Sequence, residues 1–142
     1  MKPVQLLAVF AENKPEQLAR VTRELADAGV NIHWVGIADM QKFGVIRFLV
    51  DKCDLAYQWL KQHGFTVSRV EVLAAEVEDR PGALHAVASI LARKGISLNN
   101  VSGFVFNHRA ILLLEAADLA AARAALTEHD IHLLSEDEML GL

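Results

Sequence analysis

The sequence predicts an α+β fold made of two tandem βαββαβ units, each an antiparallel sheet with its helices on one face. The first observation behind this prediction is an internal repeat. A shift that places Glu12 on Glu78 aligns further residues in pairs: Pro15 with Pro81, Leu18 with Leu84, Val21 with Val87, Leu25 with Leu91, and Gly29 with Gly95. The second observation is that apolar residues recur at helical spacing after each loop and then give way to runs rich in Val, Ile and Leu. A repeat of this kind indicates two copies of one structural unit.

The first copy is expected to contain four strands and two helices. Residues 5–11 form a mostly apolar strand that ends at a polar loop. Pro15 then opens a helix, as proline does best in a first turn, and Gly29 ends it as a left-handed cap residue. The remaining elements follow in order: strands over 30–38 and 43–50 around a turn at 39–42, a helix over 54–63 ended by Gly64, and a strand over 65–70.

The second copy repeats this order. Its first helix stops at Gly95, and Asp118 is expected to cap the second helix, which runs to His129. The last strand covers residues 131–134. Residues 66–77 contain neither Pro nor Gly, so one strand is expected to run from the first copy directly into the second. The sequence thus predicts two domains, residues 1–69 and 70–142.

Composition indicates a globular protein. The chain has 142 residues, of which 53% are hydrophobic and 23% charged, with a net charge of −4. Lys and Arg are scattered, so no nucleic-acid partner is expected. Apolar runs are too short to span a bilayer, so no membrane partner is expected either. The single cysteine, Cys53, fits a reducing compartment, which favours a cytoplasmic location.

Catalytic and metal chemistry are not expected. The six His residues are dispersed, and Cys53 has no partner at metal-ligand spacing. There is no glycine-rich phosphate loop and no nucleophile elbow. The sequence therefore predicts a protein that is not an enzyme and that uses no metal and no cofactor.

The loop and helix pattern resembles a known family. Asp79-x-Pro81-Gly82-x-Leu84, followed by a helix and Gly95, is similar to the ACT domain, a ferredoxin-like fold. The first copy resembles it through Asn13-x-Pro15-Glu16-x-Leu18, and the whole chain resembles the small stand-alone tandem ACT proteins of prokaryotes. The resemblance implies a non-enzymatic sensor that binds a free amino acid at the interface of its two ACT domains or of its dimer. It also implies a homodimer and a regulated metabolic enzyme as a possible partner.

The same resemblance, with the chemistry of helix ends, supplies a set of ligand-binding residues. A ligand carboxylate is expected near Gly82 and Ala83, because the start of a helix presents unpaired N–H groups. Glu16 stands where the loop of the second copy has Gly82, and its carboxylate would repel a ligand carboxylate, so unequal sites are expected. The predicted ligand-binding residues are Asn13, Pro15, Asn31, Asp79, Arg80, Pro81, Gly82, Ala83, Leu84, Asn99 and Asn100.

Structural interpretations of these residues remain open at this point. Asn13 and Asp79 are also good helix caps, and Pro15 and Pro81 are also good helix starts. Turn chemistry explains Asn31 as well as ligand binding does. The alternative function is a protein–protein interaction module with degenerate ligand sites. The sequence does not identify which amino acid would bind.

Overall fold

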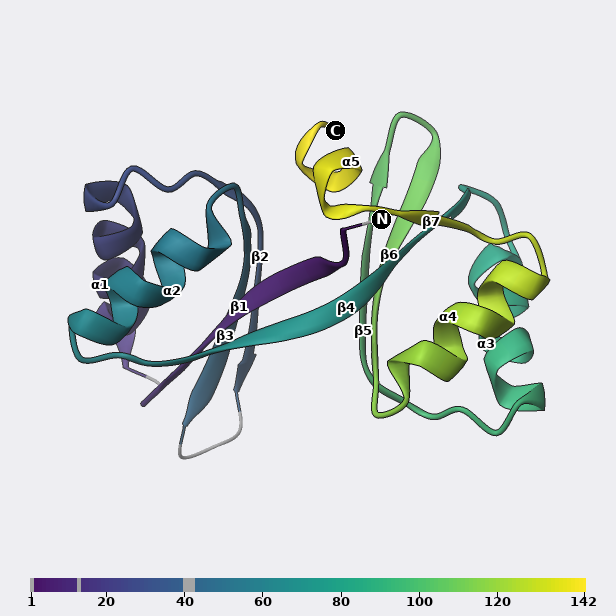
Figure 1. The fold of residues 1–142 in the computed structure, drawn as a ribbon, viewed down its shortest axis with the longest axis horizontal. Coiled ribbons are helices and arrows are strands. Elements are labelled where there is room, and N and C mark those ends of the chain that lie inside the picture. The colour runs from purple at the N-terminus through teal and green to yellow at the C-terminus, as the bar shows by residue number, and fades with distance from the viewer. Residues whose placement is uncertain (1, 13, 40–42) are drawn as a thin grey trace. The chain divides into compact units, whose positions relative to one another are not determined.

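The computed structural model describes residues 2–12, 14–39 and 43–142, and the predicted α+β class is confirmed (Figure 1). Asn13 and residues 40–42 of the predicted turn lie outside the described residues. The elements are β1 (Val4–Ala11), α1 (Pro15–Asp27), β2 (Ile32–Asp39), β3 (Gly44–Val50), α2 (Cys53–Gln62), β4 (Thr66–Glu78), α3 (Ala83–Arg93), β5 (Leu98–Phe106), β6 (Arg109–Ala116), α4 (Leu119–Glu128), β7 (His132–Leu134) and α5 (Glu136–Leu140).

The chain divides into two compact units. One is Gln5–Val70, and the other is Glu71–Leu142 together with the N-terminal residues up to Val4. The strand β4 runs across the division without a break, as the absence of Pro and Gly predicts. Each unit has the βαββαβ order, with β4 serving as the last strand of one unit and the first strand of the other.

In the unit Gln5–Val70 the strand order is β2-β3-β1-β4, and α1 and α2 cover one face of the sheet (Figure 1). The pairing of β1 with β3 is antiparallel and places Leu7 opposite Phe48 and Val9 opposite Ile46. Because side chains alternate along a strand, these four residues share the face under the helices. They form the core together with helix residues such as Leu25.

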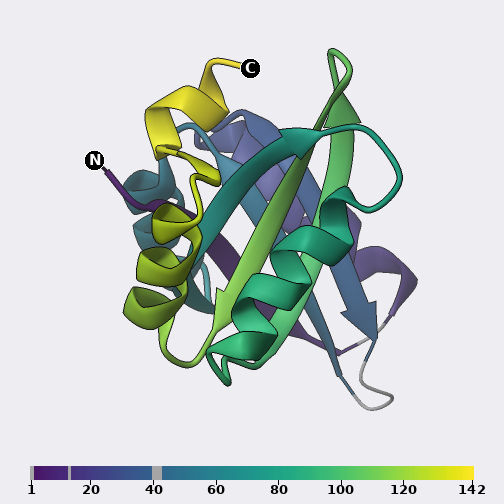
Figure 2. The same ribbon diagram turned by 90° about the vertical axis from the view of Figure 1, so that its right-hand side faces the viewer.

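The second unit repeats the arrangement in the order β5-β6-β4-β7. Leu73 lies opposite Leu114 and Ala75 opposite Leu112. These residues pack against α3 and α4, which lie side by side over the sheet (Figure 2). Asp118 caps α4 as predicted, because its carboxylate accepts a hydrogen bond from the Ala121 N–H at 3.0 Å.

Both copies carry an irregularity at the same repeat position. The register of β2 shifts between Ile32 and Trp34, and the register of β5 shifts between Leu98 and Asn100. Such a bulge leaves one residue out of the ladder, and in β5 that residue is Asn99. Asn is disfavoured in regular strands, so the bulge accounts for Asn99 without a ligand.

Two local predictions need correction. Pro15 is the first residue of α1, but Pro81 lies in a turn before α3, which begins only at Ala83. The C-terminal helix α5 was not expected, although its capping box is visible in the sequence: the Ser135 hydroxyl accepts from the Glu138 N–H at 3.2 Å, and the Glu138 carboxylate accepts from the Ser135 N–H at 3.0 Å.

The helix end at Gly29 gives a test of the fold. Gly29 has a φ of +74°, which confirms the left-handed cap, and a Cβ there would meet no atom within 4 Å. Gly29→Ala is therefore expected to lower the free energy of unfolding by about 1 kcal/mol through backbone conformation alone. Gly29→Asn should lose less, because Asn tolerates this conformation. Urea unfolding measures both variants, and equal losses would contradict this explanation.

Candidate functional site

Lys14 and Arg80, which occupy the same repeat position before the first helix of each copy, make the same two contacts. The Lys14 N–H donates to the Glu12 carbonyl at 2.9 Å, and the Arg80 N–H donates to the Glu78 carbonyl at 3.0 Å. The side chains of the same residues form ion pairs, Lys14 with Glu12 and Arg80 with Glu78, at 2.9 Å in each case. The repeat thus keeps one cation and one carboxylate at the start of each first helix.

The Glu12–Lys14 pair predicts a measurable pH dependence. The hydrogen bond and charge of Lys14 lower the pKa of Glu12, and Glu12 raises the pKa of Lys14. A lowered carboxyl pKa stabilises the fold above the unfolded-state pKa, and this contribution is lost as pH falls through the folded-state pKa. In an NMR titration the pKa of Glu12 should therefore rise toward its ordinary value in Lys14→Met. An unchanged pKa of Glu12 in this variant would show that the ion pair does not form in solution.

The two helix starts differ in backbone conformation. Gly82 is the N-cap of α3 with a φ of +89°, whereas Glu16 is already helical. This conformation, which L side chains rarely adopt, accounts for glycine at position 82 without a ligand. Asp79 does not cap α3, since no side chain does; instead its N–H donates to the His108 carbonyl at 3.4 Å.

A groove of about 300 Å³ lies beside this loop in the unit Glu71–Leu142. Two of the predicted ligand residues, Arg80 and Ala83, line it. Its described lining consists of charged side chains of both signs around apolar ones: Glu76, Glu78, Arg80, Arg109, Asp130 and His132 around Val77, Ala83, Ala86 and Ile131. The volume is at the lower end of the range of about 300–1,000 Å³ found for small-molecule sites.

Ion pairs orient the two arginines of this groove. The Arg109 Nε lies 2.9 Å from Glu76 Oε1, and the Arg80 Nε lies 2.9 Å from Glu78 Oε2. A guanidinium held through Nε keeps its two terminal NH₂ groups, which match the geometry of a carboxylate. His132 Nε2 lies 3.7 Å from the second oxygen of Glu76. The groove therefore offers hydrogen-bond donors for an anion next to carboxylates that suit a cation.

Asp130 contributes a further carboxylate from an unusual backbone conformation. Its φ is +59°, and the residue at the same repeat position in the first copy is Gly64. Asp is one of the few residues other than Gly that adopt this conformation. The turn is therefore retained in the second copy, with a carboxylate added beside the groove.

The corresponding groove at the first loop is much smaller. It holds about 50 Å³ and lies between the loop, the start of α1 and strands β2 and β3. Its described lining residues are Ala11, Glu12, Lys14, Gln17, Leu18, Ile37, Gly44 and Ile46. This volume falls well below the range of small-molecule sites and leaves room for little more than ordered water.

The other predicted residues lie at separate places. The Asn31 N–H donates to the Asp51 carboxylate at 2.9 Å, which ties the start of β2 to the end of β3. Asn100 lies opposite Glu115 in the pairing of β5 with β6. Pro15 lies at the start of α1, Pro81 in the turn, and Leu84 is exposed on α3.

Sequence reasoning missed several groups of the groove. Arg109 comes from the start of β6 and Asp130 from the turn after α4, both far from the loop in sequence. Glu78 carried a signal, because it is identical to Glu12 in the repeat. That identity is explained by the ion pair that each glutamate makes.

Metal and membrane features are absent from the described residues. Within residues 2–12, 14–39 and 43–142, no three His, Cys, Asp or Glu side chains are grouped so that they could hold a metal ion. No helix in this part of the chain is long and apolar enough to cross a membrane.

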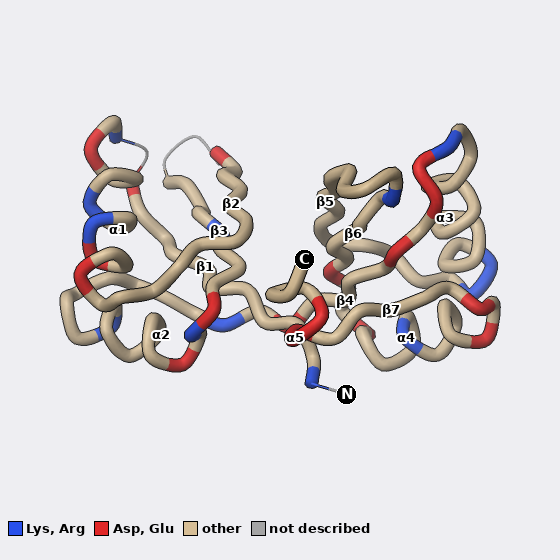
Figure 3. The backbone as a smooth tube through the Cα atoms, turned by 90° about the horizontal axis from the view of Figure 1, so that it is seen from above, with Lys and Arg blue, Asp and Glu red and all other residues tan. Residues whose placement is uncertain are grey.

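Figure 3 shows acidic and basic residues interspersed along α1, whereas most of α3 carries no charge.

Comparison with known proteins places the fold. A family model described as "ACT domain pair" matches residues 2–142. The chain is similar to protein BT0572 from Bacteroides thetaiotaomicron, with a TM-score of 0.92 and 28% identity over 99% of this chain and 97% of that one. It also shares its fold with the ligand-free regulatory subunit of aspartate kinase from Thermus thermophilus, with a TM-score of 0.64 and 15% identity over 90% and 93% of the two chains. No curated protein sequence matches the chain.

Proposed function

This chain is a member of the ACT domain pair family, and from that membership we propose that it is a cytoplasmic, non-enzymatic regulatory protein that senses a free amino acid. The fold it shares with the regulatory subunit of aspartate kinase supports a regulatory role. The groove in Glu71–Leu142 supports a zwitterionic ligand, because charges of both signs surround an apolar lining.

The observation that carries the proposal is that Arg80 and Ala83, two residues expected at the ligand from sequence, line this groove together with Arg109 and Asp130. The α-carboxylate would accept hydrogen bonds from the terminal NH₂ groups of the two arginines. The α-ammonium would donate to the Asp130 carboxylate. The side chain of the ligand would rest on the apolar residues, of which Ala83 is one.

The volumes of the two grooves beside the loops support one ligand site there rather than two. The groove beside the second loop, with about 300 Å³, admits a small amino acid, and the groove beside the first loop, with about 50 Å³, does not. The repulsion expected from Glu16 acts in the same direction. The first loop is therefore the part of the chain that best fits the alternative function, an interaction module with a degenerate ligand site.

A thermal-shift screen with the twenty standard amino acids tests the proposal. A ligand that binds only the folded state raises its stability by RT ln(1 + [L]/Kd), or about 2.7 kcal/mol at a hundred times Kd. At least one amino acid is expected to raise the melting temperature. If none does, the interaction module becomes the better function, and conversion of any of them would show an enzyme.

We further propose a homodimer that contacts a metabolic enzyme. The edge strand β2 exposes two apolar side chains, Val35 (48% exposed) and Ile37 (57%), and an edge of this kind is suited to pairing with another chain. Val35→Lys is expected to shift the protein from dimer to monomer in light scattering coupled to size exclusion. The control Leu55→Lys, an exposed apolar residue on α2, should remain dimeric. A wild-type monomer at high concentration would exclude the homodimer.

A further inference from the structure

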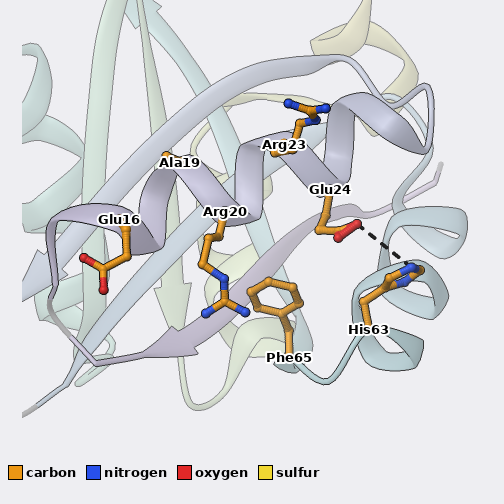
Figure 4. A pocket seen from close by; sticks show the side chains of 7 residues that line it. All are labelled: Glu16, Ala19, Arg20, Arg23, Glu24, His63 and Phe65. Carbon is orange, nitrogen blue, oxygen red and sulfur yellow. Dashed lines mark ion pairs between the residues drawn. The ribbon is translucent and has the colours of Figure 1, made fainter.

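A second groove of ligand size lies in the unit Gln5–Val70, away from the small groove at the first loop. It holds about 380 Å³ between α1 and the segment 63–65 that leads into β4. Figure 4 shows the described residues that line it: Glu16, Ala19, Arg20, Arg23, Glu24, His63 and Phe65. In the repeat, Arg20 and Phe65 correspond to Ala86 and Ile131, which line the groove of the other unit.

Some of the charged groups in this groove already have partners. Glu24 Oε1 accepts from the Trp59 Nε1–H at 3.3 Å and lies 4.0 Å from His63 Nε2. The Arg23 Nε lies 3.3 Å from Asp27 Oδ1, and its side chain points away from Phe65 (Figure 4). The Glu24 carboxylate and the Arg23 guanidinium are therefore engaged by other residues of the protein.

Arg20 and Glu16 are the two remaining residues of opposite charge in this groove. Arg20 lies over the Phe65 ring, with its guanidinium carbon 5.3 Å from the ring centre, and its Nη1 makes a long contact of 3.4 Å to Gln17. Glu16 lies one helical turn earlier on the same side of α1 (Figure 4). Among the described residues, neither Arg20 nor Glu16 forms an ion pair within 4.0 Å, and the Glu16 charge contributes to raising the pKa of Lys14.

The geometry points to a second amino-acid site in this groove, with the ligand carboxylate on Arg20 and the ligand ammonium on Glu16. The Phe65 ring holds the Arg20 guanidinium in place by a cation–π contact. The guanidinium is planar, and its N–H groups match a carboxylate. Ala19, the small residue of the lining, leaves space for the ligand's side chain. The ligand class rests on the proposed function, whereas the site is separate from the groove of Glu71–Leu142.

A zwitterion fits this groove better than a simple ion. A carboxylate or phosphate without an ammonium group would be repelled by Glu16, and an amine without a carboxylate would be repelled by Arg20. Only a ligand with both charges uses Arg20 and Glu16 together.

The test is an NMR titration of the ¹⁵N-labelled full chain with an equimolar mixture of the twenty standard amino acids. We expect saturable shifts of the amides of residues 16–24 and 63–65. Arg20→Gln and Glu16→Gln should each weaken this response about tenfold, since each removes one charge-assisted contact. Lys61→Gln, the control at an exposed cationic residue of α2 that does not line the groove, should leave it unchanged. The side chains of Glu16 and Arg20 are both exposed, so their variants should retain the fold.

The outcomes separate this site from the proposed function. Shifts confined to residues 76–86 and 130–132 would overturn the second site and leave the proposed function standing. Shifts at residues 16–24 that persist in both Arg20→Gln and Glu16→Gln would also overturn it. Shifts at residues 16–24 that survive in Arg109→Gln but are weakened in Arg20→Gln would support it.

Discussion

Phe48→Ala is expected to lower the free energy of unfolding of the unit Gln5–Val70 by about 3–5 kcal/mol, the range for removing a buried aromatic ring. Phe48 is 0% exposed and lies on β3 in the core beneath the helices. Phe48 pairs with Leu7 on β1 and with Val35 on β2, and loss of its buried ring is expected to leave a cavity in this core. A loss of this size is a large fraction of the stability of a typical domain.

Hydrogen exchange measures this effect locally. Amides of Gln5–Val70 should lose protection in Phe48→Ala, and urea unfolding should give the magnitude. The control Leu55→Ala removes an exposed side chain on α2 and should change stability by less than about 0.5 kcal/mol. A loss under about 1 kcal/mol for Phe48→Ala would mean that β3 is not at the centre of this core.

The double variant Arg80→Gln/Arg109→Gln is expected to weaken binding of the responding amino acid about a hundredfold. Each arginine would supply a charge-assisted contact to the ligand carboxylate, and a tenfold loss for each corresponds to about 1.4 kcal/mol, at the low end for such contacts because both side chains are partly exposed. The measurement is isothermal calorimetry with the amino acid that gives the largest thermal shift.

Two controls sharpen this result. Arg93→Gln alters an arginine of α3 that does not line the groove, and its binding should equal that of the wild type. Arg109→Lys keeps the charge but not the planar fork, so it should fall between the wild type and Arg109→Gln. If the double variant bound as tightly as the wild type, the ligand carboxylate would lie elsewhere.

The fold could be predicted almost completely from the sequence. The repeat and the apolar spacing gave the βαββαβ order of both copies, and the resemblance to the ACT domain is confirmed by the family match over residues 2–142. The differences lie at the start of α3 and in the short helix α5. Pro81 lies before α3 rather than at its first residue, because Gly82 takes a left-handed conformation and the helix begins at Ala83. The helix α5 was not predicted, because its five residues give too short a periodic pattern.

The candidate site could be predicted only in part. Arg80 and Ala83 were found because they follow a repeated loop motif. Arg109 and Asp130 were not found, because they lie in β6 and in the turn after α4 and carry no local motif. Asn99 lies at a strand bulge, whereas Asn31 contacts Asp51 only through its backbone N–H, so a ligand role for the Asn31 side chain stays a prediction.

The sequence by itself determined the two copies, their order of elements and their buried faces, because periodicity and turn residues are local properties of the chain. It also showed that the loops had diverged, with Glu16 in one copy and Gly82 in the other. The tertiary structure alone decided where grooves open, since a groove depends on which distant side chains meet. Ala86 and Ile131 line the groove with Asp130 and Arg109 in one unit, while the larger Arg20 and Phe65 line the groove with Glu16 in the other.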